Sequence, residues 1–222
     1  MNNELIQYII ALSNLYGMVH KRKVLEIYNQ QNTDKITIKD IELLQENIPG
    51  EVDDAWIEVH KGYFVSSVIL EHHEFLYYLR EKENKPYYVP KKVKLLNYAD
   101  GFYWEKNQEY YRVVSHLKKY FSKDSEKAVD IAGDVQLLCQ FDYKLNQILD
   151  RMEQMGVVFK NDVDIQKTLN LVVQLKNNTR IWENNGYSPN ELREILDLKM
   201  KEPVPALSVA YPGKSSISCK LE

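Results

Sequence analysis

The sequence predicts a mainly α-helical protein with two modules, residues 1–85 and 86–200, and an extended or disordered tail, residues 201–222. Apolar residues recur every three or four positions through most of the chain, which is the period of a helix. A strand-like pattern occurs only around residues 56–65. The helix-breaking run Asn84-Lys85-Pro86 separates two helical stretches and marks the module boundary, and the sequence after Lys201 becomes rich in Pro and Ser.

The first module carries three helices and a β-hairpin. Thr37 is placed to cap the third helix, with Asp40 as its capping-box partner. β-Branched and aromatic residues on both sides of Lys61-Gly62 predict a hairpin. Three helices followed by a hairpin is the element order of a winged helix, so we expect a winged-helix-like module. Its helices are expected at residues 4–16, at 21–31, from Thr37 to just before Pro49, and at 71–83, and the strands at 56–60 and 63–65.

The second module is expected to be wholly helical. The end of its longest helix is clearly marked: Gly186 suits the left-handed position after a helix, and Ser188 is an N-cap. Pro189 fits the first helical position, and Glu191 closes a capping box. Helices are expected at residues 90–99, at 107–121, from Asp124 or Ser125 onward, at 142–154, at 162–183, and after Ser188.

Charge is segregated along the chain, although the net charge is only −3. Residues 1–85 carry nine Lys or Arg and fourteen Asp or Glu, a net charge of −5. Residues 91–123, which we call the basic belt, carry eight basic and three acidic residues, a net charge of +5. The protein as a whole therefore has no field that attracts nucleic acid or an anionic membrane, whereas the belt has one locally.

Aromatic residues are interleaved with the cations of the basic belt. This combination suits an acidic protein partner, because aromatic and Arg side chains serve as binding hot spots. It also suits single-stranded nucleic acid, whose bases stack on aromatic rings. A solvated helix face with inward-pointing rings, or docking of the belt on the acidic first module, would show the same pattern. The predicted partner-binding residues are Lys91, Lys92, Lys94, Trp104, Tyr111, Arg112, Lys118 and Lys119.

DNA reading by the winged-helix-like module is disfavoured by the sequence of its third helix. That helix would enter the major groove. It presents Lys39, but also Asp40, Glu42 and Glu46. Because phosphate attraction supplies most non-specific affinity for DNA, an acidic helix works against binding. A protein-binding module is the alternative interpretation.

No catalytic residue, cofactor or metal ligand is predicted. His60, His72 and His73 lie near Glu71 and Glu74 in the sequence, but adjacent histidines on a helix point about 100° apart, and no His-x-x-x-His or Cys pair accompanies them. Neither a glycine-rich phosphate loop nor a nucleophile elbow is found. Cys139 could serve as a nucleophile by residue type, but Leu137, Leu138 and Phe141 flank it in the sequence. We therefore expect it to be a small buried side chain.

The sequence predicts a cytoplasmic protein without a membrane partner. Its two cysteines, Cys139 and Cys219, form no disulfide framework, which fits a reducing compartment. The first residues include Glu4 but no basic cluster, so they do not form a secretory signal. No apolar run approaches the roughly 20 residues of a membrane-spanning helix. The Lys-, Asn-, Ile- and Tyr-rich composition is typical of an AT-rich bacterium or its phage.

Residues 177–192 resemble a segment of an uncharacterised Firmicutes family related to SEC-C motif-containing proteins. The shared pattern is Trp-Glu-Asn-x-Gly-x-x-Pro-Asn-Glu-Leu, and residues 15–20, 26–29 and 87–90 resemble the same family. In that family the segment often precedes a C-terminal zinc knuckle with a Cys-x-Cys and a later Cys-Cys or Cys-His pair. Here only Cys219 follows Glu191, so the knuckle is missing. The resemblance implies no activity.

The sequence therefore predicts a non-enzymatic binding or regulatory protein that acts through protein–protein contacts, with an unidentified partner. The alternative is a nucleic-acid-binding regulator that uses the basic belt. A further alternative is a phage or mobile-element protein that inhibits a host machine.

Overall fold

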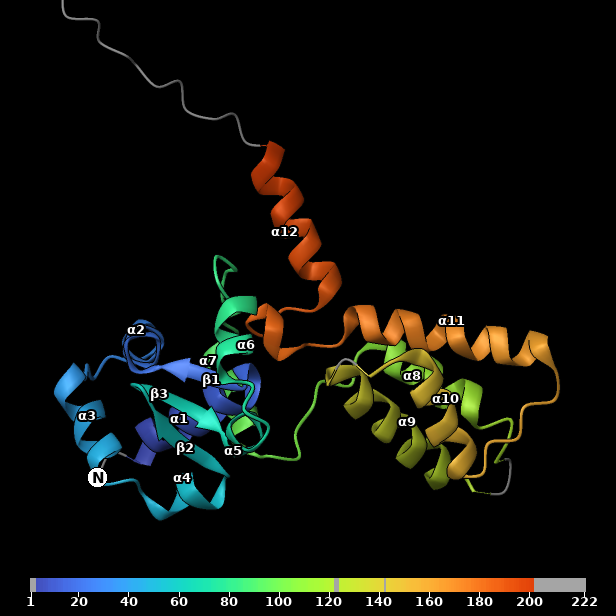
Figure 1. Cartoon of the computed structure of the whole chain (residues 1–222), viewed down its shortest axis with the longest axis horizontal. Coiled ribbons are helices and arrows are strands. Elements are labelled where there is room, and N and C mark those ends of the chain that lie inside the picture. Colours follow the sequence, from blue (N-terminus) through green and yellow to red (C-terminus); the bar gives the residue numbers. More distant parts are fainter. Residues whose placement is uncertain (1–2, 122–123, 142, 202–222) are drawn as a thin grey trace, which may run out of the picture.

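The computed structural model describes residues 3–121, 124–141 and 143–201. They are 65% helix and 6% strand, with one three-stranded antiparallel sheet, so the predicted mainly α fold is confirmed. The chain forms two lobes (Figure 1). The N-terminal lobe contains the sheet, the C-terminal lobe contains helices α8–α11, and the chain returns to the junction of the lobes before its last helix, which projects away from both.

The N-terminal lobe has the first three expected helices and the hairpin, together with the short helix α4 and one strand, neither of which was expected. Gly17, at φ 73°, ends the first helix and turns the chain directly into this strand, which pairs with the second hairpin strand. The sheet order is β1-β3-β2, so the strand completes the winged-helix-like arrangement. The elements are α1 (Asn3–Tyr16), β1 (Met18–His20), α2 (Lys21–Gln31), α3 (Ile38–Glu46), α4 (Gly50–Asp54), β2 (Ile57–His60) and β3 (Tyr63–Ser66).

The single helix expected at residues 71–83 is wrong. The structure has two short helices, α5 (Ser67–Glu71) and α6 (Phe75–Glu81), because His73 takes a left-handed backbone conformation at φ 58° between them. Next come α7 (Lys92–Leu96) and the 3-10 helix η1 (Asn97–Ala99), which lie against α1. Leu95 and Tyr98 belong to the N-terminal hydrophobic core. This core therefore reaches past residue 85, where the sequence predicts the module boundary.

The C-terminal lobe is helical, with α8 (Gln108–Leu117), α9 (Ser125–Gln140), α10 (Leu145–Gln154) and α11 (Asp162–Asn178) around a second core. The longest helix ends at Asn178 rather than near residue 183, because Thr179 and Ile181 are extended. A 3-10 helix η2 (Trp182–Asn184) and α12 (Pro189–Lys201) follow. The tail predicted at residues 201–222 lies outside the described residues except for Lys201. No helix in the described ranges is long and apolar enough to cross a membrane.

Candidate functional site

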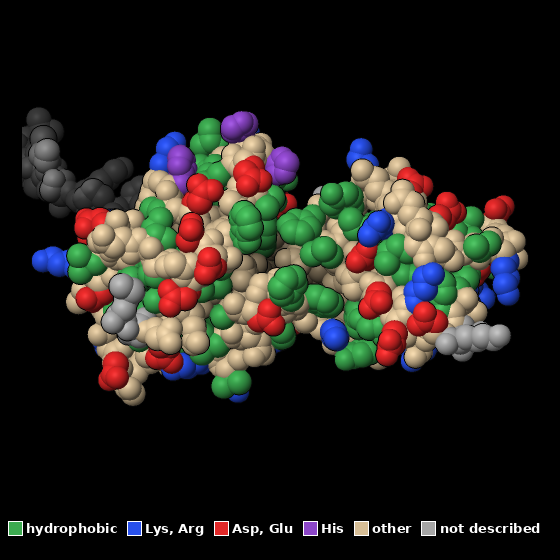
Figure 2. All heavy atoms as spheres, turned by 90° about the horizontal axis from the view of Figure 1, so that it is seen from below, with side chains coloured by type: hydrophobic (Ala, Val, Ile, Leu, Met, Phe, Trp, Pro, Cys, Tyr) green, Lys and Arg blue, Asp and Glu red, His purple; other side chains and the backbone are tan. Residues whose placement is uncertain are grey.

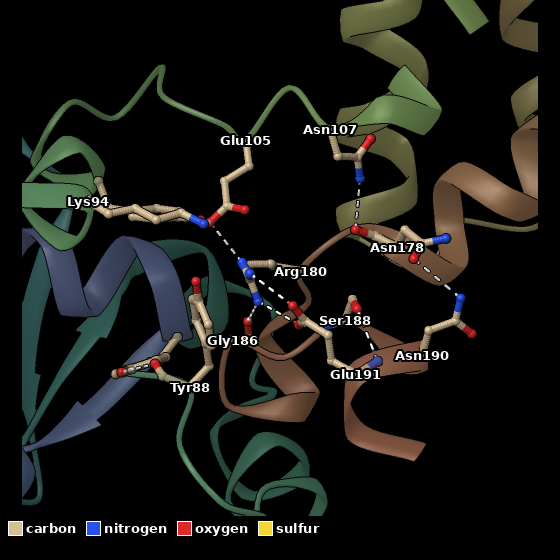
Figure 3. A network of polar contacts seen from close by, with 12 residues as sticks. Tyr88, Lys94, Glu105, Asn107, Asn178, Arg180, Gly186, Ser188, Asn190 and Glu191 are labelled. Atoms are coloured by element: carbon tan, nitrogen blue, oxygen red, sulfur yellow. Dashed lines mark hydrogen bonds and ion pairs between the residues drawn. The ribbon is translucent and has the colours of Figure 1, made fainter. Parts of the chain in front are cut away.

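Arg180 is the centre of a polar network that joins the two lobes to α12. Its Nε donates to Glu105 at 2.8 Å, and its two terminal nitrogens donate to the two carboxylate oxygens of Glu191 at 2.6 and 3.1 Å. The guanidinium group also stacks on the Tyr88 ring, 3.4 Å from the ring centroid. Figure 3 shows these groups converging from different parts of the chain, with Lys94 on the far side of Glu105. This geometry fixes where the chain turns between α11 and α12.

Glu105 remains ionised within this network. Burial alone would raise its pKa, but hydrogen bonds and the positive charge of Arg180 outweigh burial and lower it. Lys94 lies 3.0 Å from the same carboxylate, and the Tyr98 hydroxyl donates to it at 2.8 Å. A carboxylate held by this many donors is a structural anchor.

The turn after Arg180 is attached to the N-terminal lobe through a buried lysine. The ammonium group of Lys82 donates to the carbonyl of Tyr16 at 2.6 Å, to the carbonyl of Trp182, and to the Oδ1 of Asn185 at 3.3 Å. The Trp182 indole N–H in turn donates to the carbonyl of Asn14 at 2.9 Å. Burial lowers the pKa of Lys82 to about 7, against the opposing effect of a nearby carboxylate.

The capping box predicted at the start of α12 is confirmed. The Ser188 backbone N–H donates to Glu191 at 3.0 Å, and the Glu191 N–H donates to the Ser188 hydroxyl at 3.3 Å. Gly186 has φ 81°, as expected for the residue in the left-handed position, and Asn185 before it has φ 49°. The segment that carries the sequence resemblance is therefore the turn that holds the lobes together.

A groove with two arms lies at this junction, and Trp182 lines both arms. One arm, of about 290 Å³, is lined by Phe102, Trp104, Leu137 and Phe141, among others. The second arm, of about 610 Å³, runs along α5 and α6. Both arms share Phe141 and Trp182, whose rings meet edge to face with centroids 5.2 Å apart. The two arms therefore meet at this pair of rings.

The side chains along the groove are large and exposed. Phe102 is 86% exposed, Leu137 51% and Tyr77 49%, and Phe141 and Tyr143 are also exposed. Figure 2 shows apolar side chains gathered at the waist between the two lobes. Isolated exposed apolar residues are common on protein surfaces, but a cluster of them in a groove marks an interaction site.

The structure divides the predicted partner-binding residues among three places. Lys91, Lys92 and Lys94 lie at α7 on the N-terminal lobe, and Trp104 lies in the groove wall. Tyr111 and Arg112 are exposed on α8, and Lys118 and Lys119 are exposed directly after its end.

Four of the six cations in this set have carboxylate partners. Lys92 pairs with Glu4, Lys94 with Glu105 at 3.0 Å, Arg112 with Glu109 at 3.6 Å, and Lys119 with Asp164. These pairs neutralise part of the belt's charge, so its attraction for an anionic partner is weaker than the sequence suggests. The groove was not identified from the sequence, although Trp104 belongs to both the predicted set and the groove.

The other sequence candidates are accounted for by structure. Among the described residues, no three His, Cys, Asp or Glu side chains come together in a way that could hold a metal ion. His72 and His73 are exposed on the turn between α5 and α6. Cys139 is buried, as expected. In α3, Asp40 caps the helix by accepting from the Thr37 backbone N–H at 2.7 Å, and Glu42 pairs with Lys21 at 2.6 Å.

No protein-family model matches this chain, and the comparisons with curated proteins and with solved structures give no match either. The resemblance of residues 177–192 to the SEC-C-related family therefore stays a prediction.

Proposed function

We propose that this protein is a non-enzymatic binding protein that holds an apolar segment of a partner protein in the groove between its lobes. The observation that carries the proposal is the convergence of large, exposed apolar side chains from both lobes on a groove whose two arms meet at Phe141 and Trp182. Aromatic anchors in a partly enclosed site are the usual centre of a protein–protein interface. Because both lobes contribute walls, a bound segment would also stabilise their relative arrangement, which suits a regulatory role.

The chemistry of the groove favours binding over catalysis. Its polar lining groups include Gln136 and Gln140 in one arm and His72 and Glu74 in the other. Ser, Thr, Cys and Lys, which often serve as covalent nucleophiles, do not occur among these lining residues. An apolar groove with a few polar groups at its edges instead provides contact area and orientation for a ligand.

Site-specific photo-crosslinking in the native cells tests this proposal. A benzophenone amino acid is placed at Leu137 in the groove and, as a matched control, at Val158. Val158 is another exposed apolar residue and lies between α10 and α11, at the opposite end of the C-terminal lobe. We expect a discrete crosslinked protein from position 137 that is lost when Phe141→Asp is added. Equal crosslinking at both positions, or none at 137, would contradict the proposal.

A second candidate function is nucleic-acid binding through the basic belt. It is supported by the exposure of Tyr111 and Arg112 on α8 and of Lys118 directly after its end. A mobility-shift assay with single- and double-stranded DNA and RNA, at low and physiological salt, tests it. Binding that falls steeply with salt and disappears in Lys118→Glu/Lys119→Glu would support this function. No shift at low salt would eliminate it.

We also propose that the protein acts in the cytoplasm. Its low cysteine content, two residues in 222, suits a reducing compartment. Fractionation of the native cells with an antibody against the chain tests this location, and recovery in the membrane or secreted fraction would contradict it.

A further inference from the structure

The N-terminal lobe presents an acidic surface beside the groove. Between Asp40 and His60 the sequence contains seven Asp or Glu residues and no Lys or Arg. Figure 2 shows many acidic and few basic side chains on this lobe. Six of these seven residues are exposed. Four of the six lie close to Trp56 in the sequence, and none of the four is in an ion pair within the part of the chain that the structure describes: Glu51, Asp53, Asp54 and Glu58. Their negative charge is therefore free to attract a cation.

Trp56 stands among these carboxylates and is 73% exposed. Its backbone is in the left-handed region at φ 56° and is held by two hydrogen bonds. The Trp56 N–H donates to the Asp53 carbonyl at 2.9 Å, and the Trp56 carbonyl accepts from the Ser67 N–H at 2.8 Å. An exposed indole on a backbone held in this way is a platform for an Arg or Lys side chain, because Trp gives the most favourable cation–π contact.

The acidic surface adjoins the groove at the start of α5. Ser67, which contacts the Trp56 backbone, begins α5, and the next residues, Val68 and Ile69, line the groove. Glu74 lies at the same edge. A segment that leaves the groove over α5 therefore meets Trp56 and its surrounding carboxylates. Phosphate groups and anionic membranes would be repelled there, whereas cationic side chains would be attracted.

Building on the function proposed above, we propose that the partner segment is both apolar and cationic. Its apolar residues fill the groove between Leu137, Phe141 and Tyr77, and an adjoining Arg or Lys stacks on Trp56 and pairs with Asp53, Asp54 or Glu58. The groove supplies contact area, while the acidic surface selects the charge of the partner and orients it along the groove.

Three labelled synthetic peptides of equal length test this proposal by fluorescence anisotropy with the full chain. The first has Leu at helical spacing with Lys at the polar positions, the second has the same Leu residues with Glu, and the third has Lys with Ser in place of Leu. We expect the Leu/Lys peptide to bind at least about tenfold more tightly than either of the others.

Surface variants connect this preference to the proposed residues. Asp53→Asn/Asp54→Asn/Glu58→Gln should weaken binding of the Leu/Lys peptide about tenfold and reduce its salt dependence. Trp56→Asn, which tolerates the left-handed backbone, should weaken it several-fold. The matched control neutralises three exposed carboxylates on the C-terminal lobe and should leave binding unchanged: Asp130→Asn/Asp150→Asn/Glu153→Gln.

The outcomes separate the two proposals. Unchanged binding in the Asp53/Asp54/Glu58 variant, or equal binding of the Leu/Glu peptide, would overturn the cationic partner. If Leu137→Asp still abolished binding in that case, the groove itself would stand. If Leu137→Asp left binding of the Leu/Lys peptide intact, or if the Ser/Lys peptide bound as tightly, the groove would not be the site and both proposals would fall.

Discussion

Replacing Lys82 by methionine is expected to remove a pH dependence from the stability of the protein. Burial lowers the pKa of Lys82 from its ordinary value of 10.5 to about 7 in the folded chain. Between these values the unfolded chain holds a proton that the folded chain has released, so stability rises with pH. The slope is about 1.4 kcal/mol per pH unit, which gives about 2 kcal/mol between pH ~7.5 and ~9. For a chain of this length that corresponds to about 4–8 °C in melting temperature.

The assay is thermal unfolding at a series of pH values, with Lys82→Met and a control, Lys85→Met, three residues further along. Lys85 contacts the same turn, donating to the Glu183 carbonyl at 3.0 Å, but it is only partly buried. Wild type and Lys85→Met should show the rise, and Lys82→Met should lack it. The range ends near pH 9 because burial raises the pKa of Tyr16 in the folded chain. At higher pH this tyrosine ionises in the unfolded chain but not in the folded chain, which lowers stability. Parallel pH profiles for wild type and Lys82→Met would refute the reasoning.

Two substitutions test the packing at the junction. Gly17→Ala should lower the free energy of unfolding by at least about 2 kcal/mol, because the added Cβ would lie 2.4 Å from the Trp182 ring at a φ of 73°. Gly50→Ala, with no atom within 4 Å of the new Cβ, should be close to neutral in the same urea titration, and equal losses would contradict this packing. Arg180→Lys should lower the free energy of unfolding by about 1–3 kcal/mol. Lys cannot reproduce the bidentate contact that Arg180 makes with the Glu191 carboxylate on α12. Arg151→Lys, in an exposed pair, should change stability by less than about 0.5 kcal/mol, and similar values for the two Arg variants would contradict the proposed role of the network.

The helices and the hairpin were predictable because local signals specify them. The Ser188–Glu191 capping box and the helical period of apolar residues are properties of short stretches of sequence. β1 was missed because three residues are too few to show a strand pattern, and it forms only by pairing with β3. α11 was predicted too long because its end is set by tertiary contacts, with Arg180 drawn towards Glu105 and Tyr88.

The groove could not be predicted, because the sequence does not show which apolar side chains remain exposed. Leu137 was expected to pack beside Cys139, yet it faces solvent because a different side of α9 meets the second core. Phe102 and Tyr77 likewise show no local sign of exposure. Lys82, a buried cation, looks in the sequence like any surface lysine of an amphipathic helix. Its role depends on three acceptors that come from distant parts of the chain.

Hydrogen–deuterium exchange of the protein with its crosslinked partner, once that partner is purified, tests the central claim most directly. The account predicts slower exchange in both walls of the groove, namely α5–α6 and the C-terminal end of α9 through Tyr143. The exposed face of α8 should be unaffected. Protection confined to α8, with both walls exchanging as in the free protein, would contradict the groove as the binding site and favour the basic belt instead.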